Sequence, residues 1–308
     1  MSASTSSQGD VGPSFVGDLH RFEGRLSEAL GGDPQVWVAC LGEAGRLGEA
    51  GRLGEAGYPV NLAQVDGAPP CLFVRGTLVT GDALAVSVVG TRRASAAGLG
   101  VARRLGGALA SAGVTVVSGL ARGIDAAAHL GALSAGGRTI AVLGGGLCCV
   151  YPPEHAGLAS QIAASGAVVS QWWPWSPPTP EQFRRRDAVS SGLALATLVV
   201  EAGARSGARL QGRMARSQGR LLMVTDTLVG AEDWARSLVD EGSAVAVSDA
   251  DHVLEALRDR TLVDSVRYKA RIYQSSDLAT PRPADRTAGH PSRPVVPGQS
   301  RQLRLDLG

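Results

Sequence analysis

Glycine-rich segments that also contain arginine or a hydroxyl group follow several short apolar runs in the middle of the chain. They are Gly90-Thr91-Arg92, Ser118-Gly119 with Arg122-Gly123, Gly144-Gly145-Gly146 and Ser206-Gly207. Missing Cβ atoms let a ligand approach the backbone closely, and backbone N–H groups at a helix start favour an anion. Guanidinium groups add paired donors that match phosphate oxygens. These residue types at these places predict phosphate binding.

The segment 171–186 combines aromatic, proline and arginine side chains. It holds three of the five tryptophans and ends in Phe183-Arg184-Arg185-Arg186. Aromatic rings stack on bases, and arginines bind phosphates. We expect Phe183, Arg184 and Arg186 to meet such a ligand. For Trp172 and Trp173 we favour a packing role, in which the rings hold this loop against the core or a dimer partner.

Residue patterns for catalysis are not apparent. Neither G-x-G-x-x-G after the first run nor the P-loop pattern with its lysine occurs, so neither NAD binding nor ATP hydrolysis is favoured. The sequence has no recognisable Ser–His–acid set or metal-spaced cluster, and we expect His129 on the buried side of a helix. We therefore expect no catalytic residue, metal or cofactor. A nucleotide hydrolase with Glu201 and Asp125 as acid and base stays an alternative.

The apolar runs predict the elements that position these loops. Runs at 83–89, 114–118, 139–143, 167–170, 197–200, 220–224 and 243–247 alternate with helical stretches at 96–111, 125–135, 154–165, 188–194, 205–218, 232–241 and 249–257. Continuous apolar strands that alternate with helices are typical of a parallel sheet covered on both faces. We predict an α/β fold of extended Rossmann type, with a doubly wound, mostly parallel sheet. Ligands of such sheets bind outside the carboxyl ends of the strands, so the glycine loops should share one edge.

Three regions follow from composition. Residues 1–57 form a short helical and low-complexity region with the repeat LGEAGR, residues 58–257 form the domain, and residues 258–308 form a flexible, basic, proline-rich tail. The net charge is only +2, so a nucleic-acid site must be a local patch. Four cysteines without a C-x-x-C pair, and the lack of a signal peptide or membrane-spanning run, predict a cytoplasmic protein.

The motifs of residues 58–257 together resemble the DNA-processing protein A family (DprA, also called Smf). VGTRRAS, AGVTVVSGLARGIDAAAHLGAL and GRTIAVLGGGLCCVYPPEH follow in that family's order and spacing. The resemblance implies a homodimer that binds single-stranded DNA without sequence preference and hands it to a RecA-type recombinase in natural transformation. It also implies that Arg92 contacts phosphate, that Ser118, Gly119, Arg122 and Gly123 supply donors, and that Phe183 stacks on a base. Ser206-Gly207 matches the S-G of the family.

The second half departs from the family pattern. Where the family has F-x-x-R-N-R, this chain has Asp187 and Ala188 after Arg186, and the family's A-V-P-G after the sixth strand is replaced by Met223-Val224-Thr225-Asp226. Two lost arginine–phosphate contacts would weaken DNA binding by ~2–4 kcal/mol. Two alternatives therefore stay open: a site for a nucleotide or nucleotide-derived signal, and a dimeric scaffold that has lost its ligand.

Overall fold

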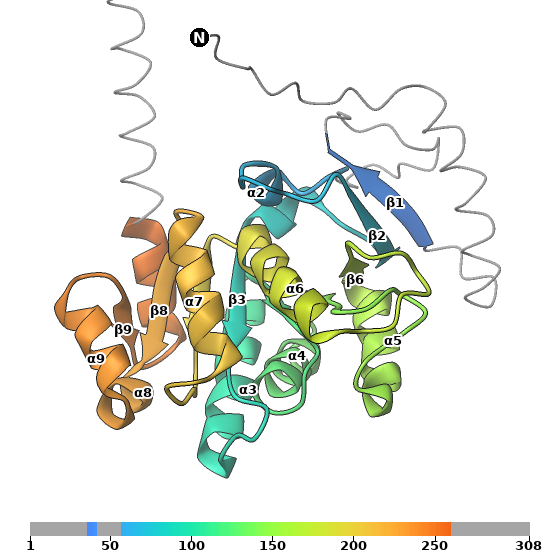
Figure 1. The fold of residues 1–308 in the computed structure, drawn as a ribbon. Coiled ribbons are helices and arrows are strands. Elements are labelled where there is room, and N and C mark those ends of the chain that lie inside the picture. Colours follow the sequence, from blue (N-terminus) through green and yellow to red (C-terminus); the bar gives the residue numbers. More distant parts are fainter. Residues whose placement is uncertain (1–35, 42–56, 260–308) are drawn as a thin grey trace, which may run out of the picture. The chain divides into compact units, whose positions relative to one another are not determined.

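The apolar runs of the sequence form a nine-stranded sheet in the computed structural model, which describes residues 36–41 and 57–259 (Figure 1). The strand order is β1-β2-β6-β5-β4-β3-β7-β8-β9. Strand β2 pairs antiparallel with both β1 and β6, and the other neighbouring strands are parallel. The strands are β1 (Val36–Cys40), β2 (Cys71–Gly76), β3 (Ala85–Val89), β4 (Thr115–Ser118), β5 (Thr139–Val142), β6 (Ala167–Ser170), β7 (Ala196–Val199), β8 (Leu221–Thr225) and β9 (Val245–Val247).

Helices cover both faces of this sheet, because alternate side chains of each buried strand point to opposite sides. Along β7, Ala196 and Leu198 pack with α3 and α4, whereas Val199 packs with α7 and α8. Figure 1 shows α6 and α7 on one face. The helices are α2 (Val60–Ala63), α3 (Ala96–Ser111), α4 (Ile124–Ser134), α5 (Ala156–Ser165), α6 (Pro180–Leu193), α7 (Gly207–Ser217), α8 (Asp226–Ala231), α9 (Asp233–Asp240), a last one from residue 250, and the short 3-10 turns η1 (Thr80–Ala83) and η2 (Pro153–His155).

The predicted fold class is confirmed, and the parallel strands lie within about two residues of the predicted runs. One element prediction is wrong, because Phe183–Arg186 lie on a helix and not in a loop. Helix α6 begins at Pro180, eight residues before the predicted start at 188, and Thr179 caps it by accepting a hydrogen bond from the Gln182 amide. A threonine N-cap followed by proline at the first helical position is a helix-start signal that we missed.

Several predictions fall on parts of the chain that the structure does not describe. Most of the helical and low-complexity region expected over residues 1–57, including most of the LGEAGR repeat, lies outside the described residues, and so does the basic tail beyond residue 259. The division of the chain into three regions accordingly stays a proposal. Within residues 36–41 and 57–259, no helix is both long and apolar enough to cross a bilayer.

Close contact between α3 and α4 fixes the two loops that precede these helices. Gly131 on α4 lies against the backbone carbonyl of Arg103, and Gly106 on α3 lies against the carbonyl of Ala128. A Cβ at either glycine would overlap these backbone atoms. Because glycine permits this approach, the segments after β3 and β4 reach the same edge of the sheet side by side.

Candidate nucleic-acid interface

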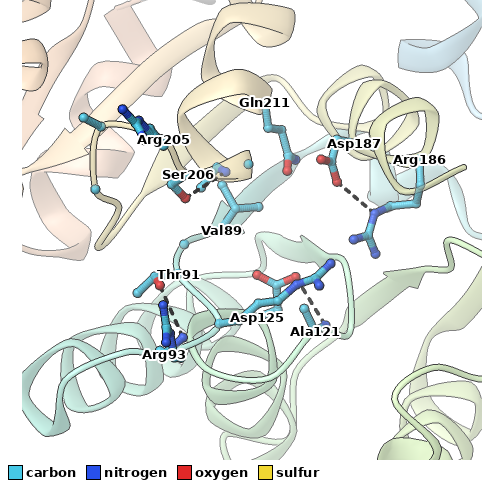
Figure 2. Close-up of a pocket in the computed structure, with 16 residues that line it drawn as sticks. Val89, Thr91, Arg93, Ala121, Asp125, Arg186, Asp187, Arg205, Ser206 and Gln211 are labelled. Atoms are coloured by element: carbon cyan, nitrogen blue, oxygen red, sulfur yellow. Dashed lines mark hydrogen bonds and ion pairs between the residues drawn. The ribbon is translucent and has the colours of Figure 1, made fainter. Parts of the chain in front are cut away.

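The main cavity lies where the strand order reverses, between the carboxyl ends of β3 and β7 (Figure 2). This is the place where doubly wound sheets bind their ligands. The cavity has a volume of about 540 Å³, and its wall carries four arginines against two aspartates. Among its lining residues are Gly90, Thr91, Arg92, Arg93, Asp125, Arg186, Asp187, Arg205, Ser206, Gly207 and Gln211.

One wall of this cavity is the start of α7. Ser206 is the N-cap, and its hydroxyl accepts a hydrogen bond from the Ala208 amide. Nothing lies within 4 Å of the position that a Cβ would take at Gly207, so this turn is open to the cavity. The exposed Arg205 precedes it. Backbone N–H groups and a guanidinium therefore face the same space, which suits a phosphate.

Arg186 is almost fully buried at 4% exposure, and it joins α6 to the ends of two strands. Its Nη1 donates to the carbonyl oxygens of Gly119 and Val142, the latter at 2.6 Å, and its Nε donates to Asp187 at 3.0 Å. Its Nη2 has no hydrogen-bond acceptor in the described part of the chain. Arg186 therefore holds the strand ends together, and its side chain also lines the cavity.

Two buried carboxyl groups lie beside Arg186. Burial raises the pKa of Asp125 to about 6, although the positive charge of Arg186 opposes that shift. Burial also raises the pKa of Asp187, and Arg186 and Arg92 act in the opposite direction. The cavity thus carries two acidic groups within an arginine-rich wall, and burial makes both of them weaker acids than an exposed aspartate.

The segment after β4 uses most of its backbone groups internally. The Ser118 hydroxyl is buried and donates to the Val88 carbonyl at 2.6 Å, and the Gly119 and Ala121 amides donate to the Asp125 carboxylate at 3.1 and 3.4 Å. The anion that these amides bind is therefore the carboxylate of the protein itself. Helix α4 starts at Ile124 with Gly123 as its N-cap, so Asp125 lies in its first turn.

Two backbone positions give this segment its shape. Leu120 is fully buried with φ at 57°, and Gly123 has φ at 79°. Gly123 lies against the backbone carbonyls of Thr91 and Arg92, where a side chain would not fit. A leucine in the left-handed region is uncommon, and the surrounding contacts must hold it there. The turn places Arg122 outside the core while Ser118 and Gly119 stay inside it.

The N-terminus of α3 is also occupied by a side chain of the protein. Glu201 accepts hydrogen bonds from the Ser95 amide, at 3.1 and 3.2 Å, and from the Ser95 hydroxyl at 2.8 Å. Gly98 leaves the space that the Glu201 carboxylate fills. This carboxylate takes the position where a Rossmann protein would hold a pyrophosphate. Because Glu201 is bonded to Ser95, the N-cap of α3, and Asp125 is bonded to amides, the structure does not place them as the acid–base pair of the alternative.

A shallow depression continues from Arg92 over the ends of β4 and β5. Arg92 lies over the Phe183 ring with its Cζ 5.1 Å from the centroid, and the Cζ of Arg186 lies 5.7 Å from the same centroid. The Tyr151 and Phe183 ring centroids are 5.6 Å apart. The depression is lined by Arg92, Gly119, Ala121, Arg122, Tyr151, Pro152 and Phe183. Arginines and aromatic rings therefore alternate along this edge.

The triple-glycine loop is a packing element. Gly144 lies against the Phe183 ring, and Gly146 lies against the carbonyls of Trp173 and Pro174. Both glycines are buried, so their backbone supports the aromatic residues and does not face the cavity. Trp173 packs edge-on against Phe73 with centroids 5.7 Å apart, although 54% of it is exposed.

The structure brings some of the predicted site residues together and separates others. Gly90, Thr91, Arg92, Arg186, Ser206 and Gly207 line the cavity, and Gly119, Arg122 and Phe183 line the depression next to it. Arg184 is exposed but lines neither, and the fork of Arg122 is paired with Glu154. Ser118, Gly123, Gly144 and Gly146 shape the loops from within.

Sequence reasoning missed several residues of this region. Arg205 follows Gly203-Ala204 and precedes a helix cap, which is a signal comparable to that of Arg92. Tyr151 comes directly before two prolines at the end of a strand loop, where an aromatic side chain becomes exposed. Asp125 and Glu201 were considered as an acid–base pair, but their hydrogen bonds to the Gly119 amide and to Ser95 could not be predicted, and neither could the ion pair of Glu154 with Arg122, because such contacts leave no periodic pattern.

Other titratable residues support the fold. His129 is fully buried, its Nδ1 shares a hydrogen bond of 2.6 Å with the Thr139 hydroxyl, and burial lowers its pKa to about 3. It stays neutral at physiological pH, as a packing role requires. The described residues contain no cluster of three or more His, Cys, Asp or Glu side chains that could hold a metal ion.

Comparisons with known proteins agree with this geometry. Residues 51–258 match the family model described as DNA recombination-mediator protein A. Protein Smf of Escherichia coli is 39% identical over 204 residues, which cover 65% of this chain and 54% of that protein. The chain thus matches about half the length of this relative.

Two solved structures share the fold. DNA processing protein A of Streptococcus pneumoniae is 34% identical with a TM-score of 0.59, covering 64% of this chain and 70% of that one. The protein of the same name from Helicobacter pylori, whose structure is described as giving insights into a single-stranded DNA binding mode, is 23% identical with a TM-score of 0.59. That match covers 67% of this chain and 95% of the other, and at this identity it speaks for the fold alone.

Proposed function

Since the chain belongs to the DNA recombination-mediator protein A family, we propose that it binds single-stranded DNA without sequence preference. We further propose that it acts as a homodimer in the cytoplasm and passes the DNA to a RecA-type recombinase during natural transformation. The recombinase, the dimer and the location rest on family membership. The protein acts by binding and positioning, and no chemical step is assigned to it.

One observation carries the DNA-binding proposal. Arginines that follow three different strands gather at one edge of the sheet with Arg186 of α6, and aromatic rings lie among them. Arg92, Arg93, Arg122 and Arg205 are exposed there, so each can reach a phosphate oxygen, Arg122 in exchange for its ion pair with Glu154. Phosphate contacts carry no sequence information, and aromatic stacking accepts every base. Binding at such an edge is therefore independent of sequence.

The shape of the edge favours a strand over a free nucleotide. The cavity and the depression share Arg92 and Ala121, so a chain of phosphates can pass from the start of α7 to Arg122. Arg186 and Arg92 stand at the junction of these two sites. A single nucleotide would fill only the cavity and leave Arg122 and Tyr151 without a role.

Fluorescence anisotropy with labelled oligo-dT at two salt concentrations tests the proposal. The pair of variants Arg92→Ala and Arg122→Ala should each weaken binding by about 10- to 30-fold, because one charge-assisted hydrogen bond is worth ~1.5–2 kcal/mol. Each should also reduce the slope of log K against log salt by ~0.7, the value for one phosphate contact on a single strand.

A matched control separates this site from general charge. Arg104 is an exposed arginine in the middle of α3 that lines neither the cavity nor the depression, so Arg104→Ala should leave oligo-dT affinity within about twofold. Equal losses in all three variants would mean that DNA binds to the protein's charge in general. Saturation of the wild type by a mononucleotide, together with indifference to oligo-dT, would favour the small-molecule alternative.

A further inference from the structure

Tyr151 is an exposed aromatic side chain beside the proposed DNA path. Its relative exposure is 42%, whereas most large apolar side chains of the described residues are buried. It lies in the segment between β5 and η2, and it lines the depression with Arg92, Arg122 and Phe183. Single exposed rings are common on protein surfaces, so what distinguishes Tyr151 is its place among arginines, where a base could stack on it.

Phe183, the residue expected to stack on a base, has most of its surroundings filled by the protein. Arg92 and Arg186 lie over the ring at 5.1 and 5.7 Å from its centroid, and the Gly144 backbone lies directly against it. It is only partly exposed. A base could reach Phe183 only after Arg92 moves away from it.

Tyr151 extends this aromatic surface outward. Its ring centroid is 5.6 Å from that of Phe183, and the two planes are inclined by 57°. The pair is therefore in contact without a parallel stack, which leaves a face of Tyr151 for another ring. The Phe183 ring packs against the Tyr151 ring, and the Gly144 backbone in turn packs against Phe183.

The phosphate-binding groups lie at both sides of this ring. Arg92 follows β3 and Arg122 follows β4, and both line the same depression as Tyr151. A phosphate held by either arginine would place the next base over the exposed tyrosine. Since stacking does not depend on which base is present, this arrangement fits a strand of any sequence.

We propose that Tyr151 is the base-stacking platform of the DNA site, and that Phe183 supports it from within. The proposal rests on the proposed function, because it assigns a residue to the same ligand. The ligand of the Tyr151 phenol ring is then a nucleobase of single-stranded DNA, stacked on the ring.

Anisotropy with two probes of equal length tests this assignment. One probe is labelled oligo-dT, and the other is an abasic oligomer with the same number of phosphates. Tyr151→Ala should weaken oligo-dT binding by about 5- to 150-fold, the range for the loss of one stacked base. It should change binding of the abasic oligomer by less than about twofold. Tyr151→Phe keeps the ring and should bind both probes like the wild type.

Trp175→Ala is the matched control, because Trp175 is 43% exposed but does not line the depression. It should leave both affinities unchanged. Equal losses on the two probes in Tyr151→Ala, or no loss on oligo-dT, would overturn the assignment while DNA binding by the wild type keeps the proposed function. If the wild type binds neither probe, the proposed function fails first and the assignment fails with it.

Discussion

The substitution Asp187→Asn tests whether the buried acid beside Arg186 opposes DNA binding. Asp187 replaces the asparagine that the resembled family has after its first arginine, and its side chain is 15% exposed at the wall of the main cavity. Asparagine has nearly the same shape, and its amide oxygen can still accept the hydrogen bond that Arg186 Nε now donates at 3.0 Å. The change therefore removes a charge and little else.

The expected gain follows from the repulsion between this carboxylate and a phosphate in the cavity. At a separation of ~7 Å and an effective dielectric constant of ~20, two negative charges repel by ~2 kcal/mol. Loss of that repulsion should tighten oligo-dT binding by about 30-fold at neutral pH. The gain should shrink on acidification, because burial raises the pKa of Asp187 and the wild-type carboxylate takes up a proton as pH falls.

Anisotropy titrations of wild type and Asp187→Asn across pH, with thermal melting to verify folding, measure both effects. Asp240→Asn is the matched control, because it makes the same change in net charge at an exposed position on α9. Equal affinities of Asp187→Asn and wild type at neutral pH, in a folded variant, would show that phosphate does not enter this cavity. A gain of the same size in Asp240→Asn would assign the effect to net charge.

Three further predictions concern groups inside and beside the site. Relative to Asp125→Asn, the wild type should lose about 2 kcal/mol of unfolding free energy between about pH 4.5 and pH 7. The folded-state pKa of about 6 lies above the unfolded value of 3.8, so stability is greatest below 3.8 and is lost as pH rises through 6; urea titrations measure it. Glu154→Gln frees the fork of Arg122 and should tighten oligo-dT binding by about two- to fivefold, measured by anisotropy. Gly131→Ala should cost about 1–3 kcal/mol in urea unfolding, because its methyl group would overlap the Arg103 carbonyl, whereas Gly157→Ala, with open space around it, should not.

The fold could be predicted from the sequence because it depends on regular patterns. Continuous apolar runs separated by helical stretches place seven strands near their observed positions, and the parallel order follows from that alternation. The strands β1 and β2 precede the first predicted run at 83–89 and were not predicted. The antiparallel pairing of β2 with β6 covers a sheet edge by contacts that no local pattern encodes.

The location of the site could be predicted from the sequence, but the hydrogen bonds of its donor groups could not. Strand ends predict the edge, and Arg92, Phe183 and Ser206 are indeed brought to it. The sequence does not indicate which of these donors form hydrogen bonds within the protein. Arg186 is committed to two carbonyls and to Asp187, because three distant segments meet there in the folded chain.

These hydrogen bonds within the protein determine which groups at this edge of the sheet can bind a polyanion. Two anion positions that the sequence predicted, the loop after β4 and the start of α3, are filled by Asp125 and Glu201. A carboxylate held within the fold has a high effective concentration, so a phosphate must compete with it at either position. Phosphate binding is therefore left to exposed guanidinium groups and the start of α7. Flexible surface charges give modest affinity and strong salt dependence, so a steep salt slope with weak sequence discrimination is the signature that this geometry demands.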